Sequence, residues 1–219
     1  MIHESLDGYI PLDSRAVIYC DMDGVLVDFQ ASAIDLVNML LSGEPVPGIY
    51  PDKNYLRLLG KIKDELGPDF VVSSGADLNL KPIRNFMFWV IGIDPGGFYA
   101  SLLPLEDGVN QLWPFINKTG HAVKLLTAGV KGRSWDTSTS KEGKTTWAME
   151  TLSPPPQEVI LIPARQKSEF AITGDTANVL IDDKMSTINS WNDAGGVGIL
   201  HIPGNSGRTI QKLQQLGVQ

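Results

Sequence analysis

The sequence contains very little cysteine or histidine and no long hydrophobic run. Cys20 is the sole cysteine among 219 residues, so an internal disulfide is excluded and we interpret Cys20 as a small core residue in a reducing environment. His3, His121 and His201 are scattered, which argues against a histidine-rich metal site. The longest apolar run, residues 86–93, is too short to cross a bilayer, and the N-terminus lacks the pattern of a secretory signal. We therefore expect a cytoplasmic protein that does not contact a membrane.

Positive charge is also scarce. The formal net charge is −7 and the isoelectric point is near 4.9, which disfavours a broad basic surface for nucleic acid or anionic lipid. Hydrophobic residues make up 42% of the chain and charged residues 20%, an ordinary globular composition without a sign of extended disorder. At this length we expect either one large domain or a core domain with a sizeable insertion.

Five short apolar runs, mostly of β-branched residues, have the near-continuous hydrophobicity of strands that are covered on both faces. They are residues 16–20, 121–126, 158–162, 178–181 and 196–200. Helical patterns between them predict an α/β fold with a parallel sheet flanked by helices on both faces. For the last helix, around residues 210–216, Ser206 is the expected N-cap and Gly217 the expected stop. In such sheets ligands bind at the carboxyl ends of the strands.

The interval after the first strand is too long for one crossover helix. It contains a helical pattern over residues 54–66 that ends at Gly67, followed by residues 86–93, which could be strand or buried helix. We assign residues 30–104 to a small, largely helical cap inserted after the first strand, and residues 1–29 and 105–219 to the core. Residues 128–144 are polar and rich in Gly, Ser and Thr, and we interpret them as a mobile loop over the site.

Acidic residues follow two of the predicted strands. Asp21 and Asp23 lie in the stretch DMDGVLVDF, where Gly24 permits a tight turn, and Asp182 and Asp183 end a later strand. Two exposed acids in a turn would be the unremarkable explanation of either pair taken alone. Carboxylates that converge at one sheet edge repel each other unless a cation is present, and an all-oxygen site with few protein ligands favours Mg²⁺. We expect Asp21, Asp23, Asp182 and Asp183 to hold that ion.

A phosphate held at this edge could undergo phosphoryl transfer. Asp21 is the candidate nucleophile, and Asp23 the candidate acid that protonates the leaving group and later deprotonates water. Thr127, at the end of another strand, offers a hydroxyl and a backbone N–H to the phosphate. A lysine should supply positive charge, and the spacing alone leaves both Lys144 and Lys167 open.

These motifs resemble a known superfamily. DMDGVLVDF, LLTAG and LIDDK, in this order and each after a strand, resemble three motifs of the haloacid dehalogenase (HAD) superfamily of phosphatases. Together with GFYASLLPLEDG and KTTW, they are similar more narrowly to the 5'(3')-deoxyribonucleotidase family. The resemblance covers residues 16–29 and 98–190. It implies a Rossmann-like core with a small helical cap, dependence on Mg²⁺, and hydrolysis of nucleoside monophosphates.

The resemblance also implies roles for individual residues. Asp21 matches the nucleophile, and Asp23 the acid/base, whose backbone carbonyl also meets the metal. Asp183 matches the direct metal ligand, supported by Asp182. The positions that match phosphate or substrate contacts are Gly24, Phe29 near the nucleobase, Thr127, Ala128, where the family commonly has serine, Lys167 as the first phosphate lysine and Lys144 as the second.

Other functions remain open at this point. A phosphatase for a sugar phosphate is the nearest alternative within the same fold. A nucleic-acid end phosphatase is supported only by Lys131, Arg133, Lys141 and Lys144 in the long loop, and a protein that binds a nucleotide without turnover is a third alternative. The expected partner is a small phosphate ester, in the first place a nucleotide, and a homodimer is left open. Base and sugar preference are not predicted.

Overall fold

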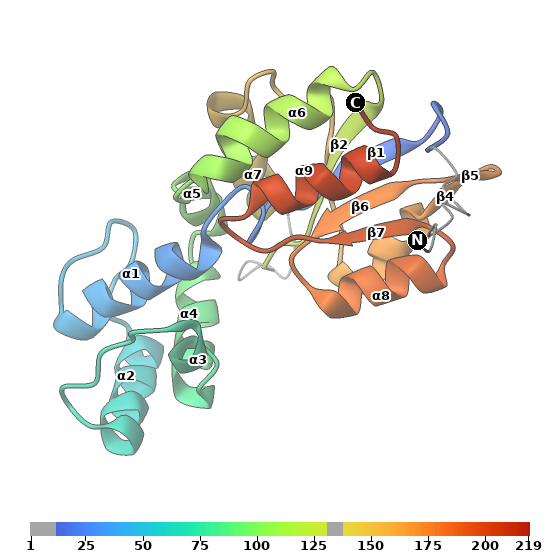
Figure 1. Ribbon diagram of the computed structural model, residues 1–219. Helices are drawn as coiled ribbons and strands as arrows, with labels where there is room; N and C mark the ends of the chain where they lie inside the picture. The colour runs from blue at the N-terminus through green and yellow to red at the C-terminus, as the bar shows by residue number, and fades with distance from the viewer. Residues whose placement is uncertain (1–11, 131–137) are drawn as a thin grey trace. The chain divides into compact units, whose positions relative to one another are not determined.

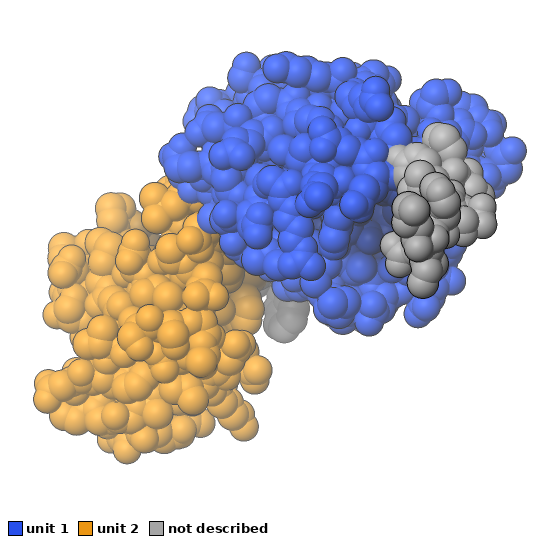
Figure 2. Space-filling model, viewed as in Figure 1, with its two compact units in different colours: residues 1–27, 104–128, 148–219 blue, residues 28–103, 129–147 orange. Residues whose placement is uncertain are grey.

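The computed structural model describes residues 12–130 and 138–219, which divide into two compact units (Figures 1 and 2). The first unit comprises the described residues up to 27 together with 104–128 and 148–219, and the second comprises 28–103 and 129–147. The second unit thus includes a segment, 129–147, that lies outside the insertion we assigned from the sequence. The long segment of the second unit runs from residue 28 to residue 103, whereas we assigned the insertion to residues 30–104.

The first unit is built on a five-stranded sheet in which every pair of neighbouring strands is parallel, with the strand order β3-β2-β1-β6-β7. The strands are β1 (Val17–Cys20), β2 (Ala122–Thr127), β3 (Val159–Leu161), β6 (Val179–Asp182) and β7 (Val197–Leu200). All five coincide with the apolar runs of the sequence, and the predicted α/β fold class is confirmed. Cys20 is fully buried in the central strand.

One face of the sheet is covered by η2 (Ala164–Phe170), a 3₁₀ helix, and by α8 (Met185–Asp193). Tyr19 of β1, Leu126 of β2 and Leu180 of β6 pack there against Trp191 of α8. Because side chains alternate along a strand, the residues that follow Tyr19 and Leu180 at two-residue spacing, Asp21 and Asp182, have the same direction. This alternation aims both carboxylates toward η2.

The remaining helices of the first unit pack together, with α6 against β2 and α9 against β7. They are η1 (Gly108–Leu112), α6 (Trp113–Lys118) and α9 (Ser206–Gln215). The chain also forms a short hairpin from β4 (Ile172–Thr173) and β5 (Thr176–Ala177). Trp113 of α6 is completely buried, as expected for a packing residue.

The N-cap of α9 is Asn205, not Ser206 as we predicted. The Asn205 side chain accepts a hydrogen bond from the backbone N–H of Arg208 at 3.3 Å. The backbone N–H of Ser206 instead donates to Asp107 at 2.7 Å, which binds the start of α9 to the segment before η1. Gly217 follows the helix with φ of 78° and ends it as expected.

The second unit is helical. Its elements are α1 (Phe29–Ser42), α2 (Lys53–Leu66), α3 (Gly75–Leu78), α4 (Lys81–Ile91), α5 (Pro95–Ala100) and the first part of α7 (Ser138–Thr151). Of residues 86–93, left ambiguous by the sequence, residues 86–91 form the end of α4, and Gly92 and Ile93 follow it. Phe86, Met87, Val90 and Ile91 of that helix are buried among residues of α1 and α2, so the run is apolar because it lies in the core of this unit.

The polar stretch 128–144 is only partly a loop. From Ser138 onward the chain is helical and begins α7, so the prediction of a loop over 138–144 is wrong, while 131–137 lie outside the described residues. Ser and Thr are weak helix formers, but burial of Ser140, Gly143 and Lys144 shows that tertiary packing stabilises the helix. Among the described residues, no helix has the length and apolar character needed to span a membrane.

Candidate functional site

Asp21 directly follows β1 and is 3% exposed. Its backbone N–H continues the sheet by donating to the carbonyl of Ile181 at 2.9 Å. Its carboxylate Oδ1 accepts the backbone N–H of Met22 at 2.8 Å. The first acid of the D-x-D pair is therefore held rigidly at the carboxyl end of the central strand.

The chain then turns sharply. The carbonyl of Met22 accepts backbone N–H groups of Val25, Leu26 and Val27 at 3.1, 2.8 and 3.0 Å. Gly24 has φ of 74°, which is left-handed backbone that glycine adopts without strain. A Cβ at Gly24 would also overlap the carboxylate of Asp183. Glycine is thus needed here both for the turn and for the close approach of Asp183.

Lys167 is buried beneath two of the carboxylates. Its Nζ lies 2.9 Å from Oδ2 of Asp21 and 2.7 Å from Oδ2 of Asp182, and its side chain is 2% exposed. Burial opposes its charge, but Asp21 and Asp182 outweigh burial and raise the pKa of Lys167. Lys167 is therefore a cation that neutralises part of the negative charge at this edge of the sheet.

Three carboxylates meet at the same place. Asp21, Asp182 and Asp183 each offer an oxygen, and these oxygens all lie within 4.8 Å of one another. Asp182 also accepts the backbone N–H of Lys184 at 2.9 Å, which fixes its orientation. Burial, followed by the charge of Asp21, raises the pKa of Asp182 and raises that of Asp183 to about 6. The single positive charge of Lys167 offsets one negative charge, and three acids converge here.

The donor set fits a hard divalent cation. Within the described part of the chain, the buried Oδ1 of Asp183 has no hydrogen-bond donor, and a buried carboxylate oxygen without a donor is unfavourable. A cation bound by oxygens of Asp21, Asp182 and Asp183 would satisfy that atom and remove the repulsion. All-carboxylate ligands with room for waters suit Mg²⁺ better than softer metals.

Asp23 lies near this group. It is half-buried in the turn, forms a bridge with Val27, and is close enough to Asp183 for its charge to raise the pKa of that carboxyl. Asp23 is not one of the three acids whose oxygens cluster. Its expected roles as an acid/base and as a metal contact stay predictions.

Thr127 is the last residue of β2, the neighbour of β1 in the sheet, and Ala128 follows it. Thr127 is completely buried, and its hydroxyl lies 3.4 Å from the carbonyl oxygen of Ala128. The backbone N–H of Ile162 donates to the Thr127 carbonyl at 3.0 Å, so this strand end is also well ordered by the sheet. Their contact with phosphate stays a prediction.

Phe29 and Lys144 belong to the second unit. Phe29 begins α1 and packs edge-to-face on Phe98 with ring centroids 5.7 Å apart. Lys144 of α7 is completely buried, and its Nζ lies 4.6 Å from the ring centroid of Tyr99. Within the first unit Lys167 bonds two carboxylates, and within the second Lys144 lies over the ring of Tyr99.

The contact of Tyr99 with Lys144 was not predicted from the sequence. Its ring lies beneath the Lys144 ammonium, and its hydroxyl accepts the backbone N–H of Val130 at 3.2 Å. A Cβ at Gly143 would overlap the carbonyl of Gly96, so α7 approaches α5 closely next to Lys144. The sequence shows that Gly96 and Gly143 are small, but it does not show that they approach each other, because they lie far apart along the chain.

Comparison with known proteins finds similarity only at the level of solved structures. No family model and no curated protein matches the sequence. A hydrolase from Streptococcus pneumoniae shares 14% identity with a TM-score of 0.46, over 91% of this chain and 100% of that one. A HAD-superfamily hydrolase of subfamily IA from Geobacter sulfurreducens shares 15% with a TM-score of 0.43, over 85% and 87%. A haloacid dehalogenase-like family protein from S. pneumoniae shares 14% with a TM-score of 0.42, over 90% and 91%.

Proposed function

We propose that this protein is a magnesium-dependent phosphomonoesterase in which Asp21 is the nucleophile. The observation that carries the proposal is the meeting of Asp21, Asp182 and Asp183 at one sheet edge with Lys167 bound to two of them. A purely structural role does not explain why a small sheet would gather three acids, two of them buried, at one edge, because converging buried negative charge is destabilising. A site for a cation and a phosphate explains it.

The proposed reaction has two steps at Asp21. A carboxylate oxygen of Asp21 attacks phosphorus, the P–O bond to the leaving group breaks, and Asp23 gives the departing oxygen a proton. Water then attacks the aspartyl-phosphate, Asp23 takes a proton from that water, and inorganic phosphate leaves with Asp21 restored. Bound Mg²⁺ would offset the negative charge of the phosphate and of the three acids.

Lys167 orients the nucleophile. It holds Oδ2 of Asp21 at 2.9 Å, while the backbone N–H of Met22 holds Oδ1 at 2.8 Å. A carboxylate fixed at both oxygens loses little freedom when it attacks, which favours a reactive geometry. The pKa of Lys167 is raised, so it stays positively charged and also stabilises negative charge on the phosphoryl group.

For the substrate we propose a nucleoside or deoxynucleoside monophosphate, in keeping with the motif resemblance. The second unit supports this choice with a cluster of aromatic rings, in which Phe29 packs on Phe98 and lies 6.5 Å from Tyr99 between ring centroids. Aromatic rings suit a nucleobase, whereas a sugar phosphate needs polar groups. A sugar phosphate is the competing substrate class, and turnover rates of both classes decide between them.

The proposal is tested with purified full-length protein and a panel of phosphate esters. The panel contains deoxynucleoside and ribonucleoside monophosphates, hexose phosphates, an aryl phosphate and a 5'-phosphorylated oligonucleotide, each with Mg²⁺ and with EDTA. We expect Mg²⁺-dependent release of phosphate, fastest with a mononucleotide. Faster turnover of hexose phosphates would overturn the substrate class alone, and no turnover of any ester with Mg²⁺ would overturn the enzyme itself.

A further inference from the structure

A cavity lies wholly within the second unit, between α2 and α4. Its volume is about 350 Å³, and its walls include Arg57 and Lys61 of α2 and Asn85, Phe88 and Trp89 of α4. Cations thus lie on one wall and aromatic rings on the other. Such a volume is at the lower end of the range of small-molecule pockets.

The aromatic wall contains a ring that the fold does not bury. Most apolar residues of α4 are buried in the core of the unit, but Phe88 remains 42% exposed. Trp89 is half-buried beside it, with its ring centroid 6.3 Å from that of Tyr55. Two neighbouring rings at the surface offer a flat apolar ligand a stacking partner.

The opposite wall is positively charged. Arg57 and Lys61 are one turn apart on α2 and therefore share one face of that helix. Lys61 forms an exposed pair with Glu65 at 3.6 Å, an interaction worth only a few tenths of a kcal/mol. Among the described residues Arg57 forms no ion pair, so its guanidinium is available to an anion.

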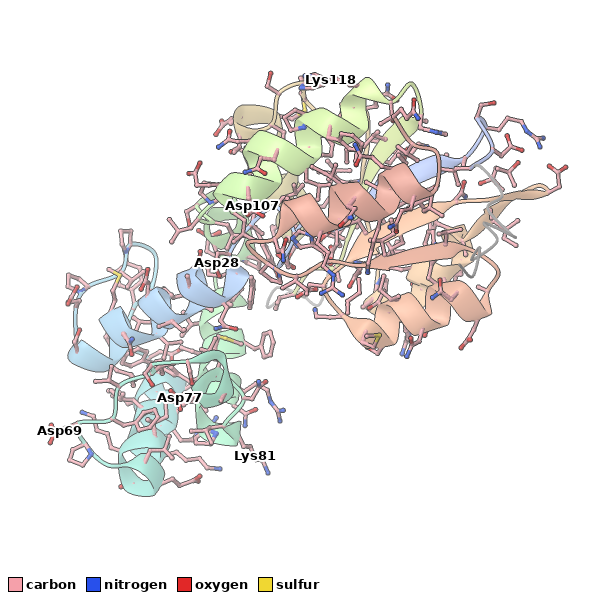
Figure 3. The ribbon with its side chains drawn as sticks, viewed as in Figure 1. Asp28, Asp69, Asp77, Lys81, Asp107 and Lys118 are labelled. Carbon is pink, nitrogen blue, oxygen red and sulfur yellow. The ribbon has the colours of Figure 1, made fainter. Side chains whose placement is uncertain are left out.

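The same two helices carry further basic residues. Lys53 precedes Arg57 by one turn on α2, and Lys81 and Arg84 occupy the first turn of α4. Lys81 is visible at the start of α4 in Figure 3, on another side of the unit from Asp69. In a chain with a net charge of −7, the two cations that line this cavity complement a negatively charged ligand.

We infer that this cavity binds a small aromatic anion, a planar ring system that carries a carboxylate, sulfonate or phosphate. The ring would stack on Phe88 and Trp89, and the anion would pair with Arg57 and Lys61. The size favours a small molecule over an acidic peptide, since a specific protein interface buries on the order of 1,000 Å² or more and this cavity extends over about one turn of α2 and about two turns of α4. The inference does not depend on the proposed phosphatase activity.

The test uses naphthalene-2-carboxylate as the probe, because it is not a phosphate ester and cannot be hydrolysed. Isotope-labelled full-length protein is titrated and followed by NMR at the Trp89 indole and the Asn85 side-chain amide. Two relatives of the probe separate the contributions: the neutral naphthalene-2-carboxamide lacks the charge, and cyclohexanecarboxylate lacks the aromatic ring. We expect each to bind about fivefold or more weakly than the probe.

Matched variants locate the site. We expect Arg57→Gln to weaken binding of the probe about fivefold, whereas Lys63→Gln, an exposed cation of α2 outside the cavity, leaves it unchanged. Phe88→Ser should weaken it similarly, whereas Leu56→Ser, at an exposed apolar residue of α2, should not. Equal effects of variants and controls, binding of the carboxamide as tight as that of the probe, or binding of an acidic peptide without binding of the probe would each overturn the inference.

Discussion

The ammonium nitrogen of Lys167 lies 2.9 Å from Oδ2 of Asp21, and both side chains are almost completely buried. The pair joins the end of the central strand to a 3₁₀ helix that covers one face of the sheet. Lys167 bonds Asp182 at 2.7 Å in the same place. It is therefore the group on which the charge balance of the three-acid cluster depends.

Asp21→Asn should abolish phosphate release while the fold survives. An amide has nearly the shape of the carboxylate but is not a nucleophile toward phosphorus, so we expect kcat to fall by a factor on the order of a thousand or more. Phosphate release and circular dichroism are measured together. Asp193→Asn, at an exposed acid of α8, is the control and should retain full activity. Substantial turnover by Asp21→Asn would contradict the proposed mechanism.

Lys167→Met should destabilise the protein strongly. It leaves Asp21 and Asp182 buried without their cation, which costs about 3–5 kcal/mol of unfolding free energy, measured by urea denaturation without metal. Adding Asp182→Asn should recover part of the loss, because one uncompensated charge disappears. Lys118→Met, at an exposed position of α6 (Figure 3), should change stability by less than about 0.5 kcal/mol. Equal effects at the two lysines would show that the buried pair contributes little.

Gly24→Ala should damage the site beyond the cost of its backbone conformation. Gly204→Ala is a matched control, since Gly204 has φ of 76° and open space where a Cβ would lie, whereas Gly24 has φ of 74° with the Asp183 carboxylate at that place. The control should lose about 1–2 kcal/mol from left-handed strain, and Gly24→Ala should lose more. Only Gly24→Ala should also weaken Mg²⁺ binding, measured by calorimetric titration. Similar losses in both variants would exclude a collision with Asp183.

Mg²⁺ should raise the melting temperature, and Asp183→Asn should remove most of that rise. A ligand that binds only the folded state stabilises it in proportion to its affinity and concentration. Without metal, Asp183→Asn should melt higher than the wild type, because burial and the charge of Asp21 disfavour the Asp183 carboxylate and raise its pKa to about 6. Thermal melts with Mg²⁺ and with EDTA measure both effects. A lower metal-free melting temperature for the variant would contradict the repulsion.

Stability should decrease on acidification through His201. Burial lowers the pKa of His201, although Asp107 opposes this shift, and its Nδ1 lies 2.8 Å from the Thr209 hydroxyl. As the pH falls below about 6.5, the unfolded chain takes up a proton on this imidazole before the folded one does, so the free energy of unfolding drops. His201→Asn keeps a group that can bond Thr209 and cannot titrate. The difference between wild type and variant should shrink with falling pH in urea denaturation from about pH 8 to about pH 5.

Local sequence was sufficient for the sheet and for the strand ends. The five apolar runs became the five parallel strands because a strand covered on both faces must be apolar along its whole length. The acids at the ends of β1 and β6 were expected at one sheet edge because parallel strands place their carboxyl ends along the same edge. Even the glycine of DMDGVLVDF was anticipated as a turn residue, and its φ of 74° bears this out.

Other features could not be read from sequence because they depend on contacts between distant segments. That Lys167 bonds Asp21 is decided by which element covers that face of the sheet, and that element is η2. Residues 86–93 suit a strand or a buried helix equally, and packing against α1 and α2 accompanies a helix over residues 86–91. Ser206 is a good N-cap by composition, but its backbone N–H bonds Asp107 and Asn205 caps α9 instead.

The amino-acid sequence by itself determined which residues form strands, which acids follow them and where the chain must turn, since burial, alternation and backbone sterics act over a few neighbouring residues. Only the tertiary structure decided that Lys167 bonds Asp21, that Asp183 approaches Gly24, and that Lys144 lies over Tyr99. The physical reason is that electrostatic and steric contacts act through space, and the chain brings together groups that are far apart along it only when the whole core has formed.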